Sequence, residues 1–197
     1  MTDTSPLSNN CVSSDSSFYI GFADDLNRKD WLFLFLSRYH FYLGKRILRE
    51  LSRSLNSDSK FLSSIQSVEF DYYELMKPYF GRDPKHLDDG EYEAIGIAHY
   101  LFMKECLKYL IIDEDKIRNF VNKHFPYLTN KLVGSIGFIR DSSTKDKTIN
   151  ISCAIDILTA TKNKIKAGKR VFGVDKNTYE IVVAPILEKL MVSRNNE

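Results

Sequence analysis

The fold is decided by residues 88–113, which read DDGEYEAIGIAHYLFMKECLKYLIID. Apolar side chains recur at helical spacing after Glu91, and acids fill the first turn, where the helix dipole favours negative charge. This pattern predicts an amphipathic helix from Glu91 to Tyr109. The apolar run Tyr109–Ile112 contains β-branched residues and ends at Asp113, which is typical of a short buried parallel strand.

The same alternation extends in both directions along the chain. Phe41–Leu43 is a candidate strand, while Trp31–Leu36 is apolar all round and fits either a helix or a strand. Further helices are predicted over residues 115–123, 149–166 and 178–190. Helices alternating with short apolar strands predict an α/β fold with a parallel central sheet and helices on both faces. Ligands of such sheets gather beyond the carboxyl ends of the strands, where Asp113 would lie.

Length and composition predict one domain. A chain of 197 residues, 43% hydrophobic and 27% charged, can bury a single core, so we expect one domain over residues 1–197. The segment 8–17 is rich in Ser and Asn and is predicted to be a loop. A second, charged loop is expected over Arg140–Lys147, within an insertion near residues 140–148.

Net charge and cysteine content exclude few classes of function, but they bear on the cellular compartment. The net charge of +2 permits an RNA substrate without arguing for one, since a nuclease must also carry acids. The three cysteines have no zinc-binding spacing and are expected to be reduced thiols. The polar N-terminus lacks the apolar run of a signal peptide, and the apolar stretches are too short to span a bilayer. We therefore expect a soluble, cytoplasmic protein without a membrane partner.

Carboxylates stand at four places beside predicted secondary structure. Each acid alone is ordinary, because surface acids are common and helix N-termini attract them. Taken together they form a set of oxygen ligands without Cys or His, which suits a hard divalent cation. The acids are Asp3, Glu50, the pair Glu91 and Glu93, and the pair Asp113 and Asp115.

Five segments in order resemble the PIN-domain superfamily, within it the VapC-like ribonucleases with DTSPL and GExEAI motifs. These are DTSPL at 3–7, ILREL at 47–51, LDDGEYEAI at 87–95, LIIDEDKIR at 110–118 and VGSIGFI at 133–139. The resemblance implies a three-layer α/β/α fold and a Mg²⁺- or Mn²⁺-dependent endoribonuclease that hydrolyses RNA. It also implies a possible toxin of a toxin–antitoxin pair, held by a small antitoxin protein, and possible homodimers. The metal would lower the pKa of a bound water that attacks a phosphodiester.

The resemblance assigns catalytic and metal-binding roles to Asp3, Glu50, Glu93 and Asp113. Residues two apart on a helix point to nearly opposite sides, so Glu91 and Glu93 cannot easily both face one metal. The family pattern places Glu93 at the metal and leaves Glu91 to assist or to favour the helix start. Supporting roles are expected for Glu91, Asp115, Thr4, Ser5 and Arg118.

Two other interpretations of the sequence stay open. Arg118 and His124 have the Arg-x5-His spacing of metal-independent HEPN ribonucleases, which are all-helical, unlike the predicted strand at residues 110–112. The second alternative is a catalytically inactive PIN-fold module that binds RNA or protein. It is favoured by the first motif, because only Met1 and Thr2 precede Asp3, and a central strand normally needs about five residues.

Overall fold

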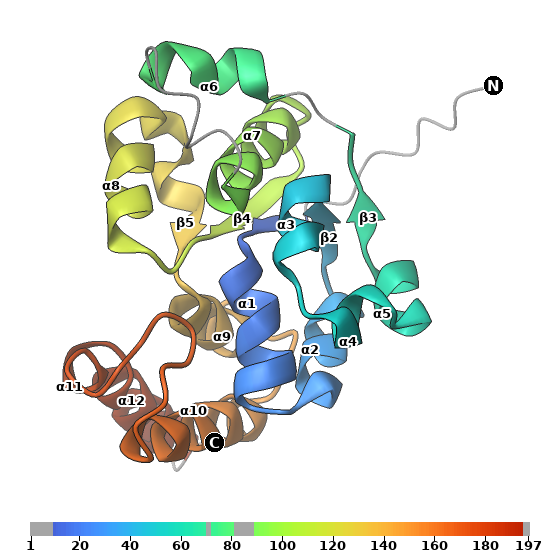
Figure 1. Cartoon of the computed structure of the whole chain (residues 1–197). Coiled ribbons are helices and arrows are strands. Elements are labelled where there is room, and N and C mark those ends of the chain that lie inside the picture. The colour runs from blue at the N-terminus through green and yellow to red at the C-terminus, as the bar shows by residue number, and fades with distance from the viewer. Residues whose placement is uncertain (1–9, 70–71, 81–88, 195–197) are drawn as a thin grey trace.

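A computed structural model describes residues 10–69, 72–80 and 89–194, and a five-stranded parallel sheet of order β3-β2-β1-β4-β5 lies at its centre (Figure 1). Every strand pairing is parallel. The predicted α/β fold with a parallel sheet between helices is confirmed. The strands are β1 (Cys11–Ser14), β2 (His40–Leu43), β3 (Gln66–Ser67), β4 (Leu107–Ile111) and β5 (Leu132–Val133).

Helices connect the strands and continue beyond the last of them. Those between β1 and β3 are α1 (Ser16–Ile20), η1 (Gly21–Asp25), α2 (Lys29–Leu36), α3 (Lys45–Glu50), α4 (Arg53–Asn56) and α5 (Ser59–Ser64). Between β3 and β5 lie α6 (Tyr73–Phe80), α7 (Gly90–Met103), α8 (Asp115–His124) and η3 (Pro126–Lys131). The chain continues with α9 (Ser135–Thr144), α10 (Ile151–Lys166), α11 (Tyr179–Val182) and α12 (Ala184–Arg194).

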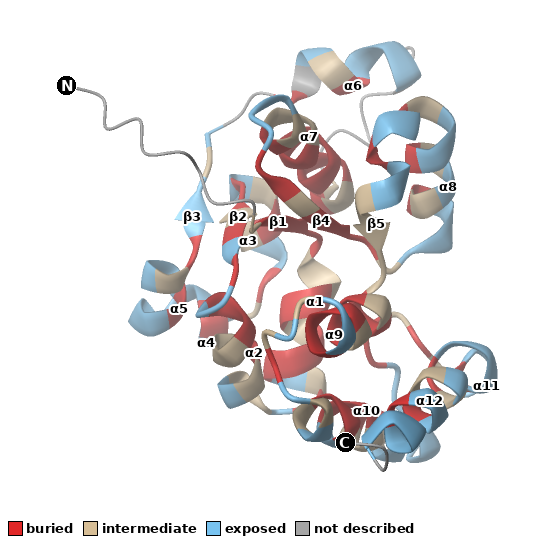
Figure 2. Cartoon of the chain, turned by 180° about the vertical axis from the view of Figure 1, so that it is seen from behind, coloured by how far each residue is buried: buried red, intermediate tan, exposed pale blue. Residues whose placement is uncertain are grey.

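Two helical layers cover the sheet. Helices α7 and α8 lie on one face, and α1, α2 and α9 lie on the other, with α10, α11 and α12 packed beyond α9 (Figure 1). An aromatic core fills the second face, where Phe18 of α1 stacks on Phe41 of β2 at 5.3 Å and meets Phe138 of α9 edge-on at 5.5 Å. The central strands and α7 are buried, whereas α11 and α12 carry exposed outer faces (Figure 2).

The loop predicted over residues 8–17 is wrong. Its residues Cys11–Ser14 form the central strand β1, paired with β2 on one side and β4 on the other, and all four residues are buried. Buried serine is tolerated because the Ser13 hydroxyl donates to the carbonyl of Ala94 at 2.8 Å. The central strand is therefore Cys11–Ser14, and Asp3, which the resemblance places at the first-strand motif, lies outside the described residues.

Several element boundaries also differ from expectation. The strands at 41–43 and 109–112 are confirmed as parts of β2 and β4, and Trp31–Leu36 is helical. Helix α7 ends at Met103 instead of Tyr109, because Glu105 takes a positive φ of 57° and turns the chain toward β4. The charged loop predicted over Arg140–Lys147 is wrong in its first half, since α9 runs to Thr144.

The described residues also bear on the cysteines and on membrane-spanning helices. The three cysteines form no disulfide, and burial raises the pKa of the Cys11 thiol to about 12. Among the helices of the described chain, none is long and apolar enough to cross a membrane.

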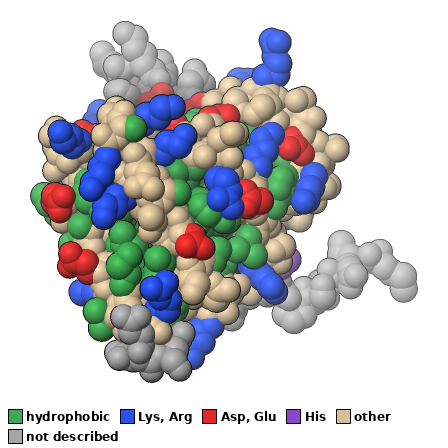
Figure 3. All heavy atoms as spheres, turned by 90° about the horizontal axis from the view of Figure 1, so that it is seen from below, with side chains coloured by type: hydrophobic (Ala, Val, Ile, Leu, Met, Phe, Trp, Pro, Cys, Tyr) green, Lys and Arg blue, Asp and Glu red, His purple; other side chains and the backbone are tan. Residues whose placement is uncertain are grey.

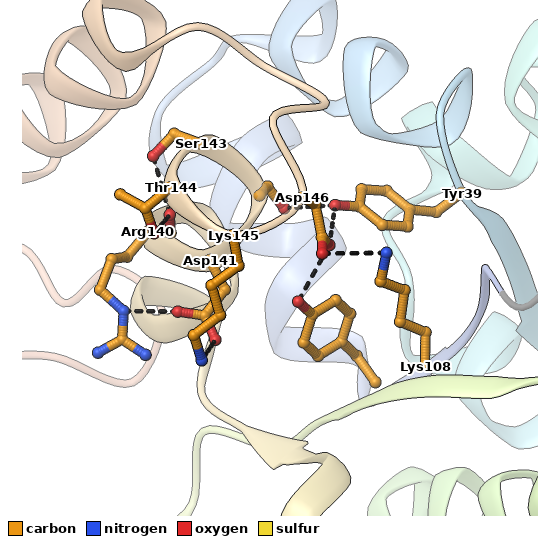
Figure 4. A network of polar contacts seen from close by, with 10 residues as sticks. Tyr39, Lys108, Arg140, Asp141, Ser143, Thr144, Lys145 and Asp146 are labelled. Carbon is orange, nitrogen blue, oxygen red and sulfur yellow. Dashed lines mark hydrogen bonds and ion pairs between the residues drawn. The ribbon is translucent and has the colours of Figure 1, made fainter.

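A polar network ties the segment after α9 to the amino-terminal end of the sheet (Figure 4). The Asp146 carboxylate accepts hydrogen bonds from the hydroxyls of Tyr39 at 2.7 Å and Tyr109 at 3.0 Å, and lies 3.0 Å from the Lys108 ammonium. Burial raises the pKa of both tyrosine hydroxyls, which keeps them as donors. This network lies at the opposite end of β4 from Asp113, so we assign it a structural role.

Replacing Asp146 with Ala should lower the free energy of unfolding by about 2–3 kcal/mol, because two buried hydroxyls and an ammonium lose their shared acceptor. Urea denaturation measures the change. The matched control is Asp30→Ala, which removes an exposed pair with Arg28 and should cost less than about 0.5 kcal/mol. Equal effects of the two substitutions would contradict the assigned role.

Candidate active site

Two aspartates meet at the carboxyl ends of the central strands. Asp15 directly follows β1, and Asp113 follows β4 after Ile112. Because β1 and β4 are neighbours, the Asp113 amide N–H donates to the Asp15 Oδ2 atom at 3.2 Å. Asp15 is 1% exposed, and its other carboxylate oxygen caps α1 by accepting from the Ser17 amide at 3.0 Å.

Asp15 is the site residue that sequence reasoning missed. The resemblance places the first acid at the end of the first strand, and in the structure that position belongs to Asp15. Asp3, Thr4 and Ser5 lie outside the described residues. The overlooked signal is the two apolar residues Cys11 and Val12, followed by a polar Ser-Ser-Asp-Ser-Ser stretch and then the apolar residues Phe18–Ile20 of α1.

The start of α9 fixes the orientation of the Asp113 side chain. The Ser135 amide donates to one carboxylate oxygen at 2.7 Å, and the Ser135 hydroxyl donates to the other at 2.5 Å. Gly134 lies close beside them, since a Cβ atom there would make a tight contact of 3.2 Å with the Asp113 Oδ1 atom. The backbone is held by Arg118, whose guanidinium donates to the Ile112 carbonyl at 3.1 Å.

Glu91 completes a carboxylate cluster, which we define as Asp15, Glu91 and Asp113. Glu91 lies in the first turn of α7 and lines the same cavity as Asp113. It is near enough to Asp15 that its charge raises the pKa of that carboxyl. Segments far apart in sequence thus bring three acids to one edge of the sheet, as the parallel-sheet prediction requires.

Glu50 and Glu93 are engaged in a different way. Glu93 is 4% exposed, and its Oε2 atom accepts from the amides of Arg46 and Ile47, both at 2.8 Å, at the start of α3. Glu50, at the end of α3, accepts from the Gly90 amide at 2.7 Å at the start of α7. Helices α3 and α7 therefore cap one another. The structure brings Glu91, rather than Glu93, into the cavity with Asp113.

Close contacts show how tightly these caps are built. A Cβ atom at Gly44 would lie 2.1 Å from the Glu93 carboxyl carbon, and one at Gly90 would lie 2.6 Å from a Glu50 oxygen. Both carboxylates thus fill spaces that only glycine leaves open. Asp115 is exposed in the first turn of α8 and lines the neighbouring cavity, which also includes Asp113 and Arg118.

Burial raises the pKa values of all three carboxyls in the cluster, and nearby negative charge adds to the rise at Asp15 and Glu91. Burial raises the pKa of Asp15 well above its ordinary value, and the nearby Asp113 charge adds to the rise. Burial raises the pKa of Asp113 from 3.8 to about 6, opposed by the Ser135 hydrogen bonds and the charges of Arg118 and Arg170. Burial also raises the pKa of Glu91, and Glu50 contributes in the same direction.

A divalent cation would relieve this repulsion, and the donor set suits one. Carboxylate and hydroxyl oxygens are the ligands of Mg²⁺, which keeps several waters and takes one or two carboxylates from the protein. Asp15 and Asp113 can supply these two. Over residues 10–69, 72–80 and 89–194, no three Asp, Glu, His or Cys side chains converge as a complete metal-binding group.

A tight turn from the C-terminal region covers one side of the cluster. Val171 and Val174 exchange backbone hydrogen bonds of 3.0 and 2.9 Å around Phe172 and Gly173, which have φ values of 52° and 71°. Positive φ at both central positions is the geometry of a type I′ turn. The Phe172 ring packs on Phe22 at 4.9 Å, and a Cβ atom at Gly173 would lie 3.1 Å from the Asp113 Cβ atom.

This turn separates two cavities that share Asp113. One, of about 460 Å³, is lined by Ser17, Glu91, Glu114 and Arg170 among others. The other, of about 450 Å³, lies toward α9 and α11 and has both apolar and charged walls. A substrate can therefore reach Asp113 from either side of the turn.

The raised pKa of Asp113 predicts the pH dependence of stability. Between pH 3.8 and about 6 the folded metal-free protein holds more protons than the unfolded chain. Its free energy of unfolding should therefore fall as pH rises through this window. Asp113→Asn should flatten this dependence and raise the free energy of unfolding at pH 7 by roughly 1–3 kcal/mol.

Urea denaturation with EDTA between pH 4 and 7.5 measures both effects. Asp115→Asn is the matched control, since this acid is exposed and lies two residues away. An unchanged pH profile in Asp113→Asn, or the same gain in Asp115→Asn, would argue against a strained carboxylate at position 113.

Substitutions of the two glutamates of α7, Glu91 and Glu93, should have different effects on stability. Glu93→Gln should destabilise the protein by about 1–2 kcal/mol, because a charged acceptor is lost from the start of α3. Glu91→Gln should be neutral or stabilising at pH 7 without metal, since it removes charge from the cluster. Thermal unfolding with EDTA compares the pair. A larger loss in Glu91→Gln would exchange the roles of the two glutamates.

Comparisons with protein-family models, curated proteins and solved structures found no match for this chain. The chemistry of the site is therefore derived from the residues themselves and from where the fold places them.

Proposed function

We propose that the chain is a PIN-type, Mg²⁺- or Mn²⁺-dependent endoribonuclease with Asp15 and Asp113 as its central metal ligands. The observation that carries the proposal is their meeting at the ends of β1 and β4, joined through the Asp113 amide at 3.2 Å. The ordered motifs of the sequence and the three-layer α/β/α fold support it. In place of Asp3, this proposal assigns the first-strand role to Asp15.

The residues divide the work as follows. Asp15 and Asp113 would hold the ion through oxygen atoms, and Glu91 would bind its water shell or accept a proton from an attacking water. Ser135 keeps both Asp113 oxygens oriented through its amide and hydroxyl. A bound Mg²⁺ or Mn²⁺ would supply Lewis acidity and a water of lowered pKa.

Glu50 and Glu93 keep the mutual capping of α3 and α7, which fixes the direction of Glu91. The metal-binding role that the family resemblance implies for both remains part of the proposal, and Glu50 is near enough to Glu91 to raise its pKa. Arg118 would steady the backbone next to Asp113 and offer its remaining donors to a phosphate. Asp115 would act at the rim of the site.

A HEPN-type mechanism has no support in this fold. HEPN domains are all-helical, whereas this chain has a five-stranded sheet. Arg118 bonds to the Ile112 carbonyl, and His124 lies against the ring of Phe120 at 4.8 Å. The two residues of the Arg-x5-His spacing thus make unrelated contacts.

A catalytically inactive module that binds RNA or protein is the second candidate. It is favoured by the engagement of Glu50 and Glu93 with backbone amides, which leaves fewer carboxylates directed at a metal. The partners suggested by family resemblance, a small antitoxin and a second copy of the chain, belong equally to either candidate. The same holds for the cytoplasmic location.

Purified protein should cleave single-stranded RNA with Mg²⁺ or Mn²⁺ and stop when EDTA is added. Asp15→Asn and Asp113→Asn should each lower kcat about 100-fold or more, since each removes a charged metal ligand. Asp146→Asn, at the far end of the sheet, is the control and should keep activity at temperatures where it is folded. Cleavage that resists EDTA would refute the metal mechanism. Intact, folded protein that binds RNA without cutting it would favour the inactive module.

A further inference from the structure

The cavity between α9 and the C-terminal helices has a composition that the cleavage chemistry alone does not explain. We call it the side cavity. It has a volume of about 450 Å³ and reaches Asp113 at one end. Apolar side chains form its walls, and arginines stand beside them; the residues that matter for its chemistry are Val133, Ile136, Val182, Ile186, Arg118 and Arg140.

The two walls come from different parts of the fold. Val133 belongs to β5, and Ile136 lies one residue after Ser135, whose hydroxyl donates to Asp113. The opposite wall is built by Val182 and Ile186, from α11 and α12, and α12 packs on α10. One wall of the cavity is therefore joined directly to the carboxylate cluster.

The arginines add anion-binding chemistry at the same place. A guanidinium carries five donors in a planar fork that matches phosphate oxygens. Within the chain, Arg118 uses its Nη1 atom on the Ile112 carbonyl, and Arg140 uses its Nε atom on Asp141 at 2.6 Å. Both arginines line the side cavity, as do the carboxylates of Asp113 and Asp115, so guanidinium donors and apolar surface are offered to one ligand beside the acids.

We propose that the side cavity binds one unpaired nucleotide of RNA, next to the phosphate that lies at Asp113. This inference rests on the proposed ribonuclease function and deepens it. The base would lie against Val182 and Ile186, and its phosphate would meet Arg118 and Arg140. A base can present its face to such walls only when it has left a duplex stack, so the substrate is single-stranded RNA or a loop.

The outer part of this region is accessible. Ile181 is 78% exposed at the rim, and Val182 is 36% exposed. Apolar and basic side chains lie intermixed on the face seen from below (Figure 3). Apolar surface interleaved with positive charge is the combination that single-stranded nucleic acid uses, through base contacts and its phosphates.

The test measures binding without cleavage. The full-length protein, with EDTA present, is titrated against an eight-nucleotide single-stranded RNA that carries one 2-aminopurine, and against the same RNA with an abasic position. Ile186→Ser and Val182→Ser should each weaken binding about five- to tenfold. Val192→Ser, an exposed α12 residue that does not line the side cavity, is the matched control and should leave the affinity unchanged.

A charge variant gives a second readout. Arg140→Gln should lower the slope of log K against log salt concentration by about 0.7, the value for one phosphate contact to a single strand. The abasic RNA should bind more weakly to the unmodified protein but respond equally to Arg140→Gln. Circular dichroism of each variant ensures that only folded protein is compared.

The proposal is overturned if the cavity variants bind like Val192→Ser, if the abasic RNA binds equally well, or if no RNA binds. It is also overturned if Val182→Ser changes self-association of the protein and not RNA affinity, since this would assign the face to a protein contact. If the protein cleaves RNA with Mg²⁺ but the side-cavity variants bind RNA as tightly as the unmodified protein, the nucleotide subsite is refuted and the ribonuclease proposal stands. If RNA binding depends on the base but no cleavage occurs, the nucleotide subsite stands and the ribonuclease proposal is refuted.

Discussion

The contact between the Asp113 amide and the Asp15 carboxylate is the constraint on which the site depends. It joins the ends of the two central strands, and so places two negative charges together where burial makes charge costly. Parallel strands alone can do this, because they deliver their carboxyl ends to one edge. The donors that face these acids, from Ser17 and Ser135, hold the carboxylates in fixed directions without neutralising them.

The carboxylate cluster also depends on contacts that hold Glu91 toward Asp15 and Asp113. Helix α7 is the longest element of the layer that contacts β1, and its start is fixed by the Glu50 carboxylate on the Gly90 amide. In turn, Glu93 of α7 caps the start of α3 by accepting hydrogen bonds from two of its amides. Because Glu91 and Glu93 differ by two residues on one helix, fixing Glu93 against α3 turns Glu91 toward the sheet edge. The structural acids Glu50 and Glu93 thus orient Glu91, a candidate catalytic residue.

Sequence patterns predicted the fold better than they predicted the site. Residues 88–113 carry a long periodic helix and an apolar strand, and both are present because their burial follows directly from that pattern. Cys11–Ser14 was missed because two serines in four residues resemble a loop, and only tertiary contacts such as Ser13 to Ala94 make them acceptable in a buried strand. Asp15 was consequently not singled out, and the sequence prediction named Asp3, which lies outside the described residues. The orientations of Glu91 and Glu93 depend on α3, which is distant in sequence.

The C-terminal turn shows what the added helices contribute to such a site. Phe172 has a positive φ, an unfavourable conformation for an aromatic residue, and the packing of its ring on Phe22 above Gly21 offsets that cost. Gly173 is then held against Asp113, where a side chain would meet the Asp113 Cβ atom at 3.1 Å. The position of the turn divides the approach to Asp113 into one side with Glu91 and Arg170 and another with Val182 and Arg140, so a ligand would meet different side chains on the two sides.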